Sequence, residues 1–151
     1  MNINELYKSI SELNREIKYL VGKTQIDTYE DMSEIESDSS NPDDNQLMHE
    51  LRDVMLHLSE ISDTITFLKK SVKGEYVLYK NSKGRYECSE HEFTSGNVIE
   101  YLAYDEYSGH YRWVISRVEH NGSDYYIVGS QSLTYERRLI PMEGLHIRIR
   151  Y

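Results

Sequence analysis

The sequence predicts an α+β protein in which an N-terminal antiparallel helical hairpin, similar to a coiled coil, precedes a small SH3-like antiparallel β barrel. Three observations predict this fold. Aliphatic residues follow a heptad repeat in two stretches of the first half, the repeat changes to two after Ser71, and glycine-bearing turns punctuate the second half. We therefore expect two domains, the hairpin at residues 1–71 and the barrel at residues 72–151.

The first helix is predicted over residues 3–20, because its aliphatic residues are spaced alternately by three and four positions. They are Ile3, Leu6, Ile10, Leu13, Ile17 and Leu20. Such a strict heptad stripe is narrow, so the helix needs one or two partner helices. Gly22 follows the stripe and suits the C-terminal cap of this helix.

Residues 24–45 contain eight acidic residues and no basic residue, so nearly all of the net charge of −9 lies in this segment. The segment also has few large apolar side chains with which to offset the entropy of ordering. We expect a flexible acidic loop here. A single helical turn through Tyr29, Met32 and Ile35 is the alternative.

The second helix is predicted to begin near Asn45, where the heptad repeat resumes. Its stripe consists of Leu47, Leu51, Val54, Leu58, Ile61, Ile65 and Leu68. Asp43, Asp44 or Asn45 can cap its start. Two matched stripes joined by a loop predict an antiparallel hairpin. Whether the hairpin closes within one chain or pairs with a second copy as a homodimer is left open by the pattern.

Strands are predicted at residues 75–79, 85–88, 97–104 and 145–151, and on both sides of a turn at Asn121 and Gly122. Five or six short strands with glycine-bearing turns favour a closed or nearly closed barrel, which removes exposed strand edges. A two-residue turn would set Glu119 opposite Asp124, a like-charge pair. A three-residue loop with Gly122 as a bulge avoids that pair and sets Ile115 opposite Ile127, so we favour it.

The second half also resembles a small bacterial domain family of unknown function, DUF5348. The resemblance spans roughly residues 74–150 and rests on motifs at residues 84–86, Gly96 with 99–100, Trp113 with 116–120, 125–127 and 144–150. The family has no established activity. The resemblance implies an origin in Gram-positive bacteria and their mobile elements, where small accessory proteins often bind host or defence machinery.

Chemical motifs are sparse along the chain. The six histidines show no metal-ligand spacing with Cys88, and no phosphate loop or nucleophile motif is present, so we expect no metal, no cofactor and no enzymatic activity. Glu119 and His120 beside Arg117 could form an acid–base set, but on a strand the first two point to opposite faces. A single cysteine and the absence of a long apolar run predict a cytoplasmic protein with no membrane partner.

The remaining signal is a surface rich in tyrosine and arginine, as binding surfaces often are. We predict partner contacts at Tyr107, Tyr111, Trp113, Arg117, Arg148 and Arg150 in the barrel, and at Asp27, Glu30, Asp31 and Glu34 in the acidic loop. The barrel is nearly neutral and the loop is acidic, which favours a protein partner over nucleic acid.

The predicted function is therefore a non-catalytic protein-interaction protein. Given the context that the resemblance implies, its concrete version is an inhibitor of a host defence nuclease, such as an anti-CRISPR protein, with the acidic loop imitating the charge of nucleic acid. The alternative is an accessory factor that binds single-stranded nucleic acid, with Tyr107, Tyr111, Trp113, Arg117 and Arg148 as stacking and phosphate contacts.

Overall fold

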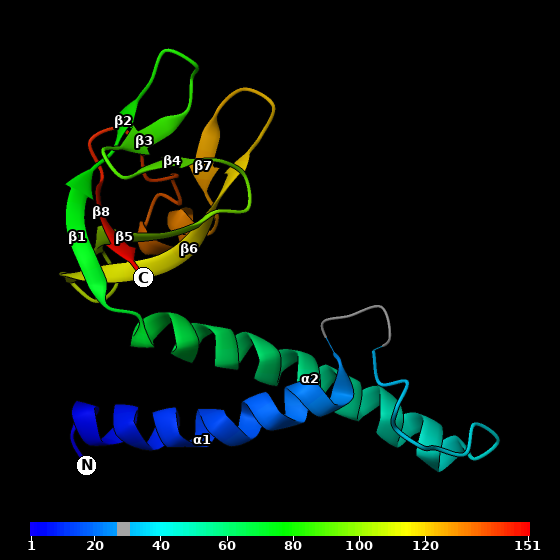
Figure 1. The fold of residues 1–151 in the computed structure, drawn as a ribbon. Coiled ribbons are helices and arrows are strands. Elements are labelled where there is room, and N and C mark those ends of the chain that lie inside the picture. Colours follow the sequence, from blue (N-terminus) through cyan, green and yellow to red (C-terminus); the bar gives the residue numbers. More distant parts are fainter. Residues whose placement is uncertain (27–30) are drawn as a thin grey trace. The chain divides into compact units, whose positions relative to one another are not determined.

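The computed structural model describes residues 1–26 and 31–151 of the chain. They form two compact units, Met1–Lys70 and Ser71–Tyr151. The first unit contains two helices and the second is built from antiparallel strands, so the α+β class is confirmed (Figure 1).

Helix α1 spans Ile3–Thr24. Its start is fixed by a capping box: the side chain of Asn2 accepts from the backbone N–H groups of Asn4 and Glu5, and the Glu5 carboxylate accepts from the N–H of Asn2. The helix continues past Gly22 and ends at Gln25, which is left-handed with φ of 49°. The predicted cap at Gly22 is wrong, because the Gln25 N–H closes the last turn on the carbonyl of Val21.

Helix α2 spans Pro42–Lys69 and begins earlier than predicted. Asn41 is its N-cap and accepts from the N–H of Asp43 at 3.0 Å. Pro42 occupies the first helical position, where its missing N–H costs nothing because that group has no partner within a helix. The predicted caps Asp43 and Asp44 lie in the first turn instead, where their charges favour the helix dipole.

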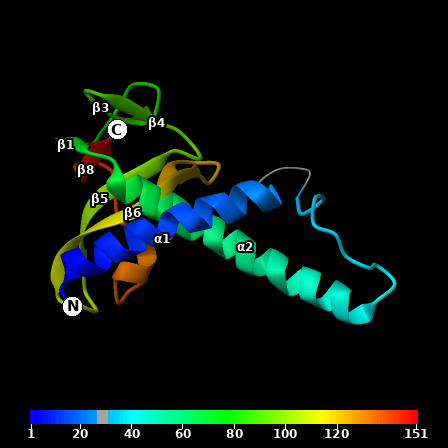
Figure 2. The same cartoon turned by 60° about the horizontal axis from the view of Figure 1, so that its bottom comes forward.

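The two helices run antiparallel and cross each other in both views (Figures 1 and 2). Asn14 donates to the Thr66 hydroxyl at 3.4 Å, and the Lys69 ammonium donates to the carbonyl of Ser11 at 2.9 Å. The seam between the helices buries only two of the thirteen heptad residues, Ile17 and Ile65. Its buried helical side chains are Asn14, Ile17, Thr24, Met55, Ser62 and Ile65.

The segment between the helices is partly anchored to them. Ile26 and Met32 are buried against Met55, and Asp31 forms an ion pair with Arg52. The predicted residues Asp27 and Glu30, together with Tyr29, lie outside the described residues. The flexibility of the loop stays a prediction.

The second unit contains two antiparallel sheets. The larger has the order β1 (Val72–Val77), β8 (His146–Arg150), β5 (Val98–Asp105), β6 (His110–His120) and β7 (Tyr125–Ile127). The smaller has the order β2 (Tyr79–Lys80), β3 (Tyr86–Cys88) and β4 (His91–Phe93), and a short 3-10 helix spans Ser130–Leu133. Strand β4 is not predicted from the sequence, because it has one large apolar residue, Phe93, and no alternating pattern.

The larger sheet is open, so the predicted closed barrel is wrong. Within residues 71–151, β1 and β7 are the two edges of this sheet and do not pair with each other. The core is completed from the other sheet instead. Tyr86 and Phe93 of the smaller sheet, with Leu78 between β1 and β2, pack in one buried cluster with Tyr101 and Ile147 of the larger sheet. Burial of the core therefore does not require a closed ladder of hydrogen bonds.

The connection between β6 and β7 has four residues, 121–124. His120 pairs with Tyr125 and Val118 pairs with Ile127, so the predicted three-residue loop and its register are wrong. The reason is the side chain of Asn121, whose oxygen accepts from the N–H groups of Ser123 and Asp124 and closes a wider turn. Ile127 consequently lies on the core face rather than beside Ile115.

Candidate interaction surfaces

The outer face of the larger sheet carries an arginine stacked on a tryptophan. In the sheet register, Leu102 lies opposite Trp113, and Glu100 lies opposite both Ile115 and Arg148. The guanidinium of Arg148 lies 3.8 Å from the centre of the Trp113 ring, a cation–π contact. Its Nε also donates to Glu75 on β1 at 3.1 Å. This arginine is thus held in place from two sides.

Exposed apolar groups flank this stack. Tyr104 and Tyr111 lie opposite each other and meet edge to face, with ring centres 5.2 Å apart. Both rings are largely exposed, as are Val77, Val98 and Ile115 on the same face. A surface of aromatic and aliphatic groups around a fixed guanidinium has the composition of a protein-binding surface.

The arginines of this unit's predicted site face carboxylates. Arg150 forms a two-pronged pair with Glu100 at 2.7 and 3.0 Å; the Glu100 side chain is buried and that of Arg150 is 12% exposed. Arg117 lies 3.2 Å from Glu119 in a more exposed pair. Because these arginines are ion-paired, the outer face is close to neutral rather than positive.

A further ion pair lies at the end of β5. There the Arg112 guanidinium holds the pKa of Asp105 below its usual value.

The structure brings five of the predicted contact residues onto this one face: Tyr111, Trp113, Arg117, Arg148 and Arg150. Tyr107 lies apart, in the turn between β5 and β6, where its ring meets that of Tyr135. It lines a shallow recess with Gln131, Ser132 and Arg137. In the helical unit, Asp31 is engaged by Arg52, and Glu34 is exposed.

The heptad stripes, which the sequence assigned to pairing between helices, are mostly exposed in the helical unit. Ten of the thirteen heptad residues are exposed, with exposed fractions of 36–76%. We call these ten side chains the open heptad face: Ile3, Leu6, Ile10, Leu13 and Leu20 of α1, and Leu47, Leu51, Val54, Ile61 and Leu68 of α2. The signal was present in the polar residues beside the stripe, Asn14 and Ser62, which are buried in its place.

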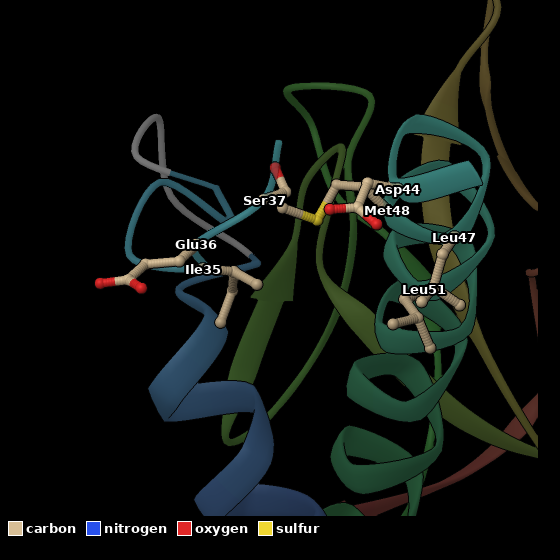
Figure 3. Close-up of a pocket in the computed structure, with 7 residues that line it drawn as sticks. All are labelled: Ile35, Glu36, Ser37, Asp44, Leu47, Met48 and Leu51. Atoms are coloured by element: carbon tan, nitrogen blue, oxygen red, sulfur yellow. The ribbon is translucent and has the colours of Figure 1, made fainter. Parts of the chain in front are cut away.

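Two depressions lie along this face. A groove of about 460 Å³ is lined by Ile10 of α1 and by Glu60, Ile61, Thr64, Ile65 and Leu68 of α2. A smaller recess of about 120 Å³ lies between the start of α2 and the segment before it (Figure 3). In that recess, Ile35 lies on one side and Leu47 and Leu51 on the other, with Asp44 near one end.

Metal-ligand clusters are not found among residues 1–26 and 31–151. No group of three histidine, cysteine or acidic side chains in this part of the chain could hold a metal ion. Glu119 faces Arg117, whereas the His120 ring stacks edge to face on Tyr125 and accepts from the N–H of Gly122. The two residues considered as an acid–base set therefore turn to different partners.

The second unit is thus a two-sheet antiparallel domain with an ion-paired, aromatic outer face. Residues 75–149 match the family model described as Domain of unknown function (DUF5348). The C-terminal half of the chain belongs to this family, as the resemblance predicted, and the helical unit lies outside the match. An origin in Gram-positive mobile elements stays a prediction.

The other comparisons add no relative. No curated protein and no solved structure matches the chain at a significant level, so the SH3-like likeness stays a prediction. Neither α1 nor α2, as described, has the length and apolar content that crossing a membrane requires.

Proposed function

We propose that the chain is a non-catalytic protein-interaction protein whose helical unit docks a protein partner through the open heptad face. The observation that carries this proposal is an inversion of the usual helical pattern. Ten heptad aliphatic residues are exposed, while Asn14, Thr24 and Ser62 are buried in the seam. Amphipathic helices normally bury the apolar stripe, so an exposed stripe implies a missing partner.

The energetics favour such a partner. Burying one aliphatic side chain contributes about 1.5–3 kcal/mol, and association costs about 4–15 kcal/mol in lost freedom. The ten side chains are 36–76% exposed, so covering most of them is enough to offset much of this cost. The outer face of the sheet unit, with Trp113 and Arg148, is a second contact region in this proposal.

The alternative, binding of single-stranded nucleic acid by the sheet face, has less support. Phosphate contacts need unpaired cationic groups, and Arg117, Arg148 and Arg150 each face a carboxylate. The narrower proposal, an inhibitor of a defence nuclease that uses the acidic loop as a nucleic-acid mimic, would be tested by the identity of the captured partner.

The test is affinity capture from a lysate of the source organism followed by mass spectrometry. The bait pair is the full chain and its Leu13→Asp/Ile61→Asp variant, which places two charges on the open heptad face. Leu56→Asp is the matched control, because Leu56 is also exposed but lies outside the heptad stripe. We expect the specific partner to be lost with the double variant and kept with the control.

Unchanged capture by the Leu13→Asp/Ile61→Asp variant, with its helical circular dichroism intact, would contradict docking through this face. A salt-sensitive affinity of the full chain for single-stranded oligonucleotides, lost on Trp113→Ala, would instead support the nucleic-acid alternative.

A further inference from the structure

We infer that the open heptad face receives an amphipathic helix of another protein whose apolar stripe is flanked by lysine and arginine. This inference rests on the proposed docking function and adds the chemistry of the partner. It is carried by the position of the charges around the face, together with the acidic residues of its two depressions.

Both helices contribute to a single face. With Ile3 and Leu51 at position a of the heptad, the buried seam lies between positions a and e, where Asn14, Met55 and Ser62 are found. Position d lies on the other side of position a in a helical wheel, and in an antiparallel pair the two d stripes fall on the same side. The groove that joins Ile10 of α1 to Ile61 of α2 agrees with this geometry.

The outer edges of this face are acidic. Position g of the heptad, which borders the d stripe, and position c, the next position outward, hold Glu5, Glu12, Glu16, Asp43, Glu50, Asp53 and Glu60. One basic residue, Lys23, shares these positions. The remaining basic residues of the helices lie at positions b, e and f: Lys8, Arg15, Lys18, Arg52 and Lys69. Negative charge thus borders the apolar face on both sides.

The depressions have the same character. Glu60 lines the groove beside Ile61 and Ile65. Asp44 and Glu36 line the recess beside Leu47 and Leu51, although Glu36 points outward (Figure 3). A helix lying along the face would place its apolar side chains in these depressions and its flanking side chains beside the carboxylates.

A second copy of this chain fits the charges poorly. Both edges of the face are acidic, so either orientation of a second hairpin sets carboxylates against carboxylates. Such like-charge contacts oppose association, whereas lysine and arginine flanks speed encounter and select the partner. The charge pattern therefore favours a basic helix of a different protein.

The test uses the full chain and two synthetic helical peptides with the same leucine stripe at positions i, i+3, i+4 and i+7. One peptide has lysine and the other glutamate at the flanking positions. Fluorescence anisotropy measures the Kd of each at low and high salt. We expect the basic peptide to bind at least about tenfold more tightly, and this preference to shrink as salt screens the charges.

A matched pair of charge reversals localises the effect. Glu60→Lys changes the edge of the face, and Asp63→Lys makes the same change three residues later, at position f on the outer side of α2. We expect Glu60→Lys to reduce the preference for the basic peptide several-fold and Asp63→Lys to leave it nearly unchanged. The Leu13→Asp/Ile61→Asp variant should bind neither peptide.

Four results would overturn the inference. Equal affinity for the two peptides, or equal effects of Glu60→Lys and Asp63→Lys, would show that the edge charges do not select the partner. A dimer in sedimentation that Leu13→Asp/Ile61→Asp dissociates would assign the face to a second copy and leave the docking function standing. Failure of both peptides to bind a monomeric chain would also overturn it. Failure of the docking function itself would be seen in a different experiment: the Leu13→Asp/Ile61→Asp variant would capture the same proteins from the lysate as the unchanged chain.

Discussion

The two units of this chain treat apolar side chains in opposite ways. In the sheet unit, Phe93, Tyr101, Val118 and Ile147 are at most 1% exposed. In the helical unit, most leucines and isoleucines of the heptad stripes are exposed, and Asn14 is 2% exposed. The sheet unit completes its core from its own two sheets, whereas the helical unit has a small cluster around Ile26, Met32 and Met55.

This difference shows that an apolar stripe predicts a surface that needs to be covered, but does not identify the element or partner that covers it. The sheet unit buries its stripes internally, so a partner of this unit would contact groups at its outer face. The helical unit leaves most of its stripes uncovered, so a partner that covers them would also stabilise the helices. Two probes separate the units: the only tryptophan, Trp113, reports on the sheet unit, and ellipticity at 222 nm reports mainly on the helices.

The largest effect is expected for the buried ion pair of the sheet unit. Glu100→Leu leaves the Arg150 guanidinium without its buried carboxylate, and breaking such a pair costs about 3–5 kcal/mol. Denaturant unfolding followed by Trp113 fluorescence measures this loss. Glu75→Leu is the control, because its pair with Arg148 is half exposed and contributes about 1 kcal/mol or less. Equal losses would contradict the distinction between the two pairs.

Two isoleucines of the same stripe should differ sharply in the helical unit. Ile65 is 5% exposed in the seam, and Ile65→Ala is expected to lower the free energy of unfolding by about 2–5 kcal/mol. Ile61 is 47% exposed, and Ile61→Ala should change it by no more than about 1 kcal/mol. The measurement is denaturation at 222 nm. Similar losses would mean that the stripe is buried in solution, and that the units do not differ as described.

The buried polar seam predicts a substitution that stabilises the helical unit. Asn14 has a buried Oδ1 with no hydrogen-bond partner among the described residues, while its Nδ2 makes only a long bond to Thr66. Asn14→Ala removes the unpaired oxygen and improves helix propensity, so we expect a gain of about 1 kcal/mol in the denaturation at 222 nm. Ser9→Ala, exposed on the same helix, isolates the propensity effect. A clear loss of stability would show that Asn14 is satisfied in solution.

The smallest expected effect is the pH response of the turn after β5. Arg112 lowers the pKa of Asp105 below 3.8, so the folded state holds this proton less tightly than the unfolded state. The resulting stabilisation is present above about pH 3.8 and is lost as the pH falls through the lowered folded pKa. Asp105→Asn should lower stability at neutral pH and flatten its decline in acid. Acid titrations of Trp113 fluorescence that run parallel in the two proteins would contradict this.

The sequence alone determined the local features of the protein. Heptad spacing located both helices, the change of period located most strands, and the matched motifs identified the domain family, because each depends on residues near one another in the chain. Alternation along each strand correctly placed Trp113 and Arg117 on one face of their strand, and Arg148 and Arg150 on one face of theirs. Helix ends were less well placed, since the Gln25 and Asn41 caps depend on conformations that no repeat encodes.

Only the tertiary structure decided how those elements are used. The seam passes through Asn14 and Ser62 rather than the leucines, because packing between two helices depends on both surfaces at once. The larger sheet stays open, because a second sheet carrying Phe93 covers the core. The turn after His120 widens, because one oxygen of Asn121 takes two backbone donors. Each outcome depends on which contacts form between residues that are distant in the sequence. Local periodicity carries no information about those contacts.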